Sequence, residues 1–199
     1  GCMFGMGAKT LLEYVAGFGV QWGDFGLNAG DVVEQWRGLH PEVAARDGLW
    51  ARLESAGRMV VEQNREQQVG LLRLRPLDGD LIVDLPAGRR VRYADARIER
   101  GRRRDGLVYR HQREQVRLWG SKLAENLTQA VARDVLAECL VRLEADGIEV
   151  VMHVHDEVVA EVEGEPELAR MRDVMRQSPS WARDLPLAVK VHSSRRYGK

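Results

Sequence analysis

The sequence predicts an α+β protein in which helices come first, short strands follow, and a hairpin flanked by helices ends the chain. Three observations lead to this class. Apolar residues recur at helical spacing in the first third of the 199 residues, and short apolar runs between turn-forming residues fill the middle. In the last third, a long amphipathic stretch precedes two apolar runs of strand length.

The first 67 residues are predicted to form a helical subdomain. The apolar spacing predicts a short helix over residues 10–17, with Thr10 as its N-cap, and a second helix over residues 29–39. A third helix is expected after Pro41, because proline suits the first turn of a helix, and it is expected to run unbroken through Val60.

Residues 68–120 are predicted to be a β-rich connection. Strands are expected over residues 69–74, 81–85 and 91–98. Turns are expected at Pro76, at Asp78-Gly79 and at residues 86–88, because proline and glycine favour the backbone angles of turns. A basic loop is expected over residues 101–106.

Residues 121–199 are predicted to contain a long helix, a hairpin, a second helix and a last strand. Ser121 is the expected cap of the long helix, and Gly147 suits the left-handed position at its end. The apolar stripe of this helix consists of Leu123, Leu127, Ala130, Val131, Leu136, Leu140 and Leu143. Strands are expected over residues 148–154 and 158–162, a helix over 167–177 and a strand over 187–192.

The charge is balanced overall but unevenly distributed. The formal net charge is zero, yet eleven arginines and four acidic residues lie between Arg89 and Arg117, a local excess of seven positive charges. Such a surface suits a nucleic acid, although a solvated arginine-rich loop is equally compatible with the count. No apolar run is long enough to cross a bilayer, and Cys2 and Cys139 have no metal-ligand spacing. We therefore expect a cytoplasmic protein with reduced thiols and no membrane partner.

The tip of the predicted hairpin carries the sharpest chemical signal. Tight hairpin turns favour glycine and asparagine, but here the two apolar runs are joined by His155, Asp156 and Glu157. Two adjacent carboxylates repel each other, so they add little to folding, and they suit a divalent cation such as Mg²⁺ with its substrate phosphates. The alternative is a solvated turn with an incidental cluster of charges.

A polar face of the long helix gives a second signal. Asn126, Gln129 and Arg133 lie three and four residues apart and therefore share one side of the helix. Amide groups can bond to minor-groove base edges of nearly any sequence. An ordinary polar helix face is the alternative.

These two signals together resemble the C-terminal palm of family A DNA polymerases, above all of the phage and prophage members. The resemblance rests on Lys-Leu-Ala-Glu-Asn-Leu-Thr-Gln-Ala-Val-Ala-Arg-Asp at residues 122–134 and on His-Val-His-Asp-Glu at residues 153–157. Leu-Pro-Ala-Gly-Arg at residues 85–89 is similar to a Leu-Pro-Ser-Gly-Arg segment of the phage group, and residues 181–199 look like the end of that group. Phe4-Gly5 matches the aromatic-glycine end of the fingers helix.

The resemblance implies a role for each matching residue. Asp156 falls on a ligand of the catalytic Mg²⁺ ions, and Glu157 lies beside them. His155 falls on a residue at the primer end, while Gln129 and, less securely, Asn126 fall on contacts to the minor groove. The DNA-binding set is completed by Arg133 and Arg89, and Phe4 and Gly5 would lie near the incoming nucleotide and template. By the same resemblance, residues 1–67 would belong to the fingers and residues 121–199 to the palm.

The resemblance also implies that the chain is incomplete as a catalyst. The family's first catalytic aspartate and the arginine and lysine of its fingers motif are absent from this sequence. We therefore expect a C-terminal polymerase segment that adds deoxynucleotides to a primer only with the missing N-terminal region supplied in cis or in trans. Its expected partners are primed DNA template and deoxynucleoside triphosphates. The opening Gly-Cys-Met-Phe-Gly-Met, which lacks an initiator methionine, is expected to be an internal cut.

Two alternatives remain open from the residues alone. The chain could be a non-catalytic DNA-binding module or a degenerate prophage remnant that keeps the fold. It could also be a folded but functionless segment, with exposed apolar surface and an unpaired strand edge beside the Asp156 hairpin.

Overall fold

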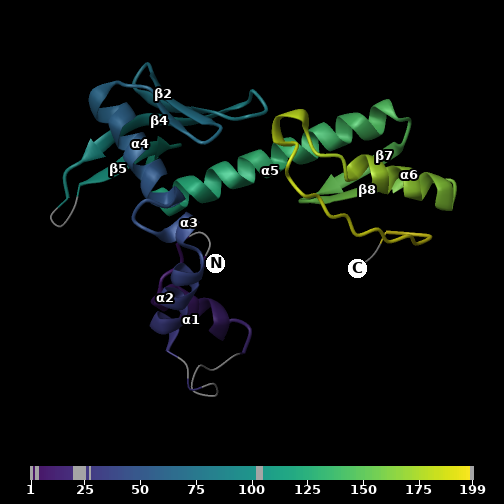
Figure 1. Ribbon diagram of the computed structural model, residues 1–199, viewed down its shortest axis with the longest axis horizontal. Helices are drawn as coiled ribbons and strands as arrows, with labels where there is room; N and C mark the ends of the chain where they lie inside the picture. Colours follow the sequence, from purple (N-terminus) through teal and green to yellow (C-terminus); the bar gives the residue numbers. More distant parts are fainter. Residues whose placement is uncertain (1, 3–4, 20–25, 27, 102–104, 198–199) are drawn as a thin grey trace. The chain divides into compact units, whose positions relative to one another are not determined.

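The computed structural model describes residues 2, 5–19, 26, 28–101 and 105–197 and contains two compact units. The first unit is Gly1–Gln129 and the second is Ala130–Lys199. The boundary falls inside one long helix, α5 (Gly120–Ala145), which contributes its first part to one unit and its second part to the other (Figure 1). Helices are combined with antiparallel strands, which confirms the α+β class.

The first unit opens with helices α1 (Ala8–Ala16) and α2 (Ala29–Leu39). Helix α2 has the predicted bounds, because Asn28 caps it by accepting a hydrogen bond from the Gly30 amide at 2.7 Å. The N-cap predicted at Thr10 is wrong. Helix α1 begins at Ala8 after Gly7, so Thr10 lies inside its first turn.

The prediction of one unbroken helix after Pro41 is also wrong. Two helices form instead, α3 (Pro41–Ala44) and α4 (Leu49–Gln63), and Pro41 does occupy the first turn of α3. The chain folds back so closely at Gly48 that a Cβ there would lie 2.7 Å from the Pro41 carbonyl oxygen. Glycine therefore permits this break.

Six strands follow as an antiparallel meander in the order β1-β2-β3-β4-β5-β6. Their bounds are β1 (Gln67–Val69), β2 (Leu72–Leu77), β3 (Asp80–Asp84), β4 (Arg90–Glu99), β5 (Gly106–His111) and β6 (Glu114–Leu118). The turn at Asp78-Gly79 is confirmed, and both residues have positive φ, at 50° and 85°. The predicted turn over residues 86–88 is confirmed too, with Gly88 at a φ of 87°.

The predictions for the middle of the chain needed three corrections. The strand predicted over residues 69–74 is divided by a turn at Gly70, whose φ is 59°. Pro76 lies within β2 rather than in a turn, at a point beyond the end of β1, so its missing N–H interrupts no ladder on that side. Strands β5 and β6 were not predicted, because arginine and glutamine occupy their outward positions and no glycine marks their turn.

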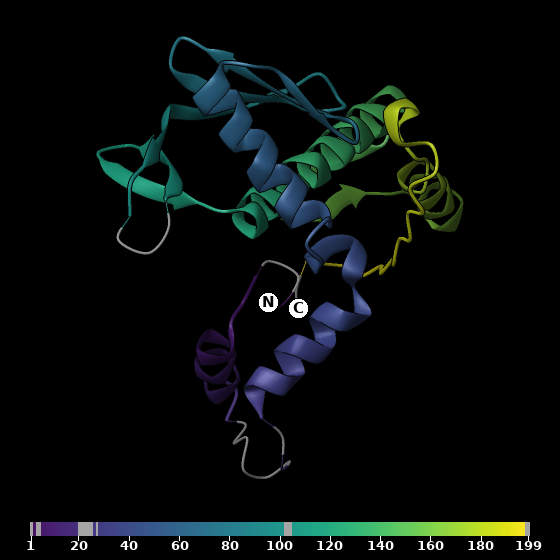
Figure 2. The ribbon, with the colours of Figure 1, turned by 60° about the vertical axis from the view of Figure 1, so that its left-hand side comes forward.

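Helix α4 packs across one face of this sheet (Figure 2). Its Gly57 faces the sheet, where a Cβ would lie 3.0 Å from Leu107 and 3.6 Å from Leu81. Leu53, Leu81 and Leu107 are almost completely buried in this interface. The start of α5 lies against α4, since the Gly120 amide donates a 3.2 Å hydrogen bond to Glu54 Oε2.

The second unit packs a hairpin and a helix against the rest of α5. Its elements are β7 (Glu149–Val154), β8 (Glu157–Glu161) and α6 (Glu165–Met175), which confirm the predicted hairpin and helix (Figure 1). The core consists of Cys139, Leu143, Ile148, Met171 and Val174. Within the described residues, β7 and β8 pair only with each other, so the expected unpaired strand edge is present.

Two details at the ends of this unit differ from the prediction. Helix α5 begins at Gly120, so Ser121 lies in its first turn and is not the cap, whereas Gly147 does end the helix with a φ of 73°. The strand predicted over residues 187–192 does not form. The described strands β7 and β8 pair only with each other, and the end of this segment, Val191 and His192, lines a cavity with residues of α6.

No helix in the described part of the chain is long and apolar enough to span a membrane. In that part of the chain, residues 8–63 are mainly helical and residues 67–118 mainly strand. The assignment of residues 1–67 to the fingers and of residues 121–199 to the palm stays a prediction.

Candidate functional site

The tip of the β7–β8 hairpin is a two-residue turn formed by His155 and Asp156. Val154 and Glu157 are register partners across it, so Glu157 is the first residue of β8 rather than part of the turn. All three predicted residues, His155, Asp156 and Glu157, are exposed. The fold thus presents them together at the end of a hairpin.

The backbone at His155 has the conformation of a tight hairpin turn. Its φ is 54°, in the left-handed region that glycine adopts most easily. Glycine here would relieve the turn, and the histidine occupies it at some energetic cost. Asp78 and Gln112 have similar φ values, 50° and 54°, in hairpin turns of the first unit, so this conformation belongs to the turn and does not by itself mark a functional site.

The two carboxylates at this tip fit Mg²⁺ only as part of a larger ligand set. Mg²⁺ in proteins is commonly held by one or two carboxylates together with water and substrate phosphates. Asp156 and Glu157 could supply that minimum. No group of three or more His, Cys, Asp or Glu side chains is positioned to hold a metal in the part of the chain that is described. Further oxygen ligands would have to come from the substrate or from other protein residues.

The predicted polar face of α5 divides into one internal contact and two exposed groups. Asn126 is half-buried, and its Nδ2 donates to Tyr93 Oη at 3.3 Å. Burial raises the pKa of Tyr93 to about 12, and its Oη is the acceptor of this bond. Gln129 and Arg133 are exposed on the same helix. These two residues, more than Asn126, are therefore available to a ligand.

Two of the remaining predicted residues lie in turns of the first unit. Arg89 is exposed, and its carbonyl accepts a 2.8 Å hydrogen bond from the Leu85 amide, which closes the turn before β4. Gly5 has a φ of 83° and lies against α5, where a Cβ would meet Ser121 Oγ at 2.1 Å. Phe4 lies outside the described residues. Gly5 thus joins the start of the chain to the first turn of α5.

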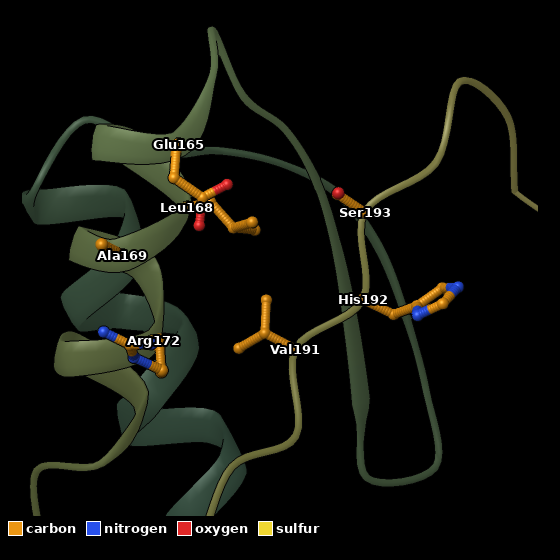
Figure 3. A pocket seen from close by; sticks show the side chains of 7 residues that line it. All are labelled: Glu165, Leu168, Ala169, Arg172, Val191, His192 and Ser193. Carbon is orange, nitrogen blue, oxygen red and sulfur yellow. The ribbon is translucent and has the colours of Figure 1, made fainter.

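A cavity of about 410 Å³ lies elsewhere in the second unit, between α6 and the C-terminal segment (Figure 3). It is lined by Glu165, Leu168, Ala169, Arg172, Val191, His192 and Ser193. None of the predicted site residues lines it, and its wall combines charged, polar and aliphatic groups without a convergent set. The hairpin tip remains the better candidate site.

Sequence reasoning counted the arginines of the middle segment but could not place them. Pairs such as Arg73 with Arg75, and Arg90 with Arg92, stand two residues apart and so share one face of a strand. To recognise that these arginines form one surface, one must know which strands are neighbours and in which register they pair.

A comparison with curated proteins finds similarity to a DNA polymerase of Bacillus phage SP02, at 36% identity over 92% of this chain. The chain spans about 30% of the length of that relative. No protein-family model matches the chain. No solved structure matches it either.

Proposed function

We propose that this chain is the C-terminal part of a DNA-directed DNA polymerase of family A, which extends a primer by two-metal phosphoryl transfer during DNA replication. The similarity to a phage DNA polymerase supports the polymerase assignment. The observation that carries the finer assignment is the hairpin tip, where His155, Asp156 and Glu157 are exposed together. The proposed setting is the cytoplasm, with primed DNA and deoxynucleoside triphosphates as partners.

In this proposal the hairpin tip supplies part of the catalytic centre. Asp156 and Glu157 would hold Mg²⁺, which when bound activates the primer hydroxyl and neutralises charge on the transferred phosphoryl group. The Asp156 carboxylate is suited to this because the turn keeps it at the surface, where a triphosphate can approach. His155 is placed next to it and would orient the primer end through a hydrogen bond.

The helix α5 and the turns of the first unit would hold the DNA. Gln129 and Arg133 are exposed and would reach the minor groove and a phosphate, respectively. Asn126 would act indirectly, since its amide is bonded to Tyr93. Arg89 would contact a backbone phosphate, and Gly5, with Phe4, would lie near the incoming nucleotide.

The chain alone is expected to have little or no polymerase activity. Removing one group that stabilises transition-state charge typically costs on the order of 10²–10³ in rate. The family's first catalytic aspartate and its triphosphate-binding cations have no counterpart in this sequence. They would be supplied by a further polymerase region, in cis or in trans.

A domain exchange tests this proposal. The segment of the Bacillus phage SP02 polymerase that aligns with this chain is replaced by residues 1–199, and extension of a primed template is measured in Mg²⁺. The controls are the intact relative and the relative truncated before that segment. We expect the chimera to extend the primer and the truncated protein to be inactive.

A folded chimera that binds primed DNA but adds no nucleotide would refute the proposed catalysis. It would favour the second candidate, a non-catalytic DNA-binding module or polymerase remnant. That candidate is favoured by one observation, that the described residues bring no third metal ligand to the hairpin tip. Extension by the isolated chain would instead refute the expected dependence on a further region.

A further inference from the structure

The six-stranded sheet has one covered face and one open face. Register partners in neighbouring strands lie on the same face, and alternate residues along a strand lie on opposite faces. Leu81 and Tyr93 are partners, and Ile98 and Leu107 are partners, so these four residues share a face. Leu81 and Leu107 approach Gly57 of α4, and Tyr93 bonds to Asn126 of α5. Helices α4 and α5 therefore cover this face.

The other face is rich in arginine. The register places Arg73 opposite Asp84, Asp84 opposite Arg90, and Ile82 between Arg75 and Arg92. Beyond the bulge that shifts the register between Ala94 and Arg97, the pairing continues on the same face. The arginines that share it are Arg73, Arg75, Arg90, Arg92, Arg97, Arg110 and Arg117. We call these seven residues the arginine face.

Carboxylates hold several of these guanidinium groups in place. Asp84 receives two hydrogen bonds from Arg75, at 2.8 and 3.2 Å, and lies 3.0 Å from Arg90 Nε. The hydrogen bond from Arg75, followed by the nearby arginine charges, lowers the pKa of Asp84 despite its partial burial. One half-buried carboxylate therefore positions two neighbouring arginines.

Similar pairs occur on both sides of this one. Arg73 makes two hydrogen bonds to Glu66, at 2.5 and 2.7 Å, and Arg92 bonds to Asp80. Past the bulge, Arg97 bonds to Asp95 at 2.9 Å. Glu99 lies two residues beyond Arg97 and shares this face. With Asp84 and Glu99, five carboxylates lie among seven arginines, which leaves an excess of two positive charges.

The guanidinium groups remain accessible although they are paired. The side chains of Arg73, Arg90, Arg92 and Arg97 are between 47% and 67% exposed, whereas the Asp80 side chain is only 9% exposed. Arginine has five donors in a planar fork, so one or two bonds to a carboxylate leave others for a ligand. Asp80 and Asp84 therefore lie deeper than Arg92 and Arg90, whereas Glu66 and Asp95 are about as exposed as their partners.

Two apolar residues lie between these arginines. Ile82 is flanked by Arg75 and Arg92, and Val108 by Arg97 and Arg117. Both are at most 3% exposed. Aliphatic stems of neighbouring arginines cover apolar surface in this way while the charged ends face water. The face is therefore a packed layer with its guanidinium groups already ordered, which lowers the entropy lost on binding.

We propose that the arginine face binds the phosphate backbone of duplex DNA. From β2 to β6 the face crosses four interstrand spacings, about 19 Å in total. A duplex carries one phosphate per about 1.7 Å of axis, so roughly eleven phosphates fall within that span. Arginine forks bind phosphate oxygens in pairs, and contacts to the backbone carry no sequence preference. The arginine face would hold duplex DNA without a contribution from the hairpin tip. This inference rests on the proposed function and deepens it, because it adds a DNA-binding surface that requires no catalysis.

Fluorescence anisotropy of a labelled blunt-ended duplex tests the proposal on the intact chain. In the test variant, Arg73, Arg90, Arg97 and Arg110 are each changed to Gln. Arg75 and Arg92 are kept, because they pair with Asp84 and Asp80, whose side chains are largely buried. A matched control variant removes four exposed arginines outside the arginine face, Arg37, Arg46, Arg52 and Arg65. Circular dichroism verifies that both variants fold.

We expect the test variant to bind the duplex at least about tenfold more weakly than wild type at low salt. The slope of log affinity against log salt concentration should fall by up to about 3.6, which is 0.9 for each of four lost phosphate contacts. The control variant should lose much less affinity. A single-stranded oligonucleotide of the same length should bind more weakly to the wild-type chain than the duplex does.

Equal loss in both variants, no loss in the test variant, or no duplex binding by wild type would overturn the proposal. Tighter binding of the single strand would overturn the assignment to duplex DNA. If the test variant does not fold, Arg90→Gln alone keeps the question answerable, because Asp84 retains Arg75; its expected effect is a slope lower by about 0.9. Primer extension by the chimera is a separate readout, so the arginine face can fail while the proposed polymerase function stands.

Discussion

The start of α5 makes a close backbone contact that one methyl group should disrupt. A Cβ added at Gly120 would lie 2.0 Å from the carbonyl oxygen and 2.6 Å from the carbonyl carbon of Trp50. The Gly120 amide also donates to Glu54, so the two helices are held together at this point. Gly120→Ala should therefore push α4 and α5 apart within the first unit.

The size of the effect follows from the distances. Ordinary contact begins at 3.4 Å, so the atoms must separate by about 1.4 Å, the difference between 3.4 and 2.0 Å. Both sides of the contact are backbone, and no flexible side chain can move away. Overpacking typically costs 1–3 kcal/mol, and we expect about 3 kcal/mol here. For a chain of this size that lowers the melting temperature by about 6–12 °C.

Gly38→Ala in α2 is the matched control. No atom lies within 4 Å of a Cβ at Gly38. Alanine there should stabilise the helix by about 0.5–1 kcal/mol, which raises the melting temperature by roughly 1–4 °C. Tryptophan fluorescence during heating follows the first unit, because four of the five tryptophans belong to it. Equal melting temperatures for Gly120→Ala and wild type would refute the packing described for α4 and α5.

Three further predictions concern the cores and the hairpin. Tyr93→Phe should remove the last step of the alkaline absorbance titration. The pKa of Tyr93 is raised to about 12, so the buried neutral phenol contributes fully to the stability of the fold below pH 10, and this contribution is lost as the pH rises toward 12. A titration that is unchanged in the variant would contradict this. Glu149→Lys should stabilise the second unit by about 0.2–1 kcal/mol in urea unfolding, because Glu149 lies opposite Glu161, and a lower midpoint would be the contrary result. Leu143→Ala should cost 2–5 kcal/mol, since Leu143 is fully buried, and wild-type hydrogen-exchange protection of α6 amides in this variant would argue against the core.

Local signals in the sequence were enough where an element is stabilised by its own residues. Helix α2 was predicted with its bounds from the spacing of its apolar residues, and the residue that caps it, Asn28, stands directly before it. The β7–β8 hairpin was predicted because its apolar runs are interrupted by His155 and Asp156. In both cases the deciding residues lie within the element or beside it.

Contacts between distant residues explain most of what was missed. The strand predicted over residues 187–192 has the right alternation, but no described strand pairs with it. Asn126 was interpreted as a groove contact, yet its bond goes to Tyr93, which is 33 residues away. The arginine face depends on the register of five strands, and that register is not legible from composition.

We propose that Asp156 holds catalytic Mg²⁺ in a DNA polymerase. The test is single-nucleotide incorporation by the chimera carrying Asp156→Asn, measured across a Mg²⁺ titration. Asp78→Asn is the matched control, because Asp78 also lies in a two-residue hairpin turn but belongs to the first unit. We predict that Asp156→Asn lowers the rate by at least about 10²-fold, while Asp78→Asn stays near wild type. A folded Asp156→Asn chimera that incorporates the nucleotide at the wild-type rate, with the same Mg²⁺ dependence, would contradict the claim.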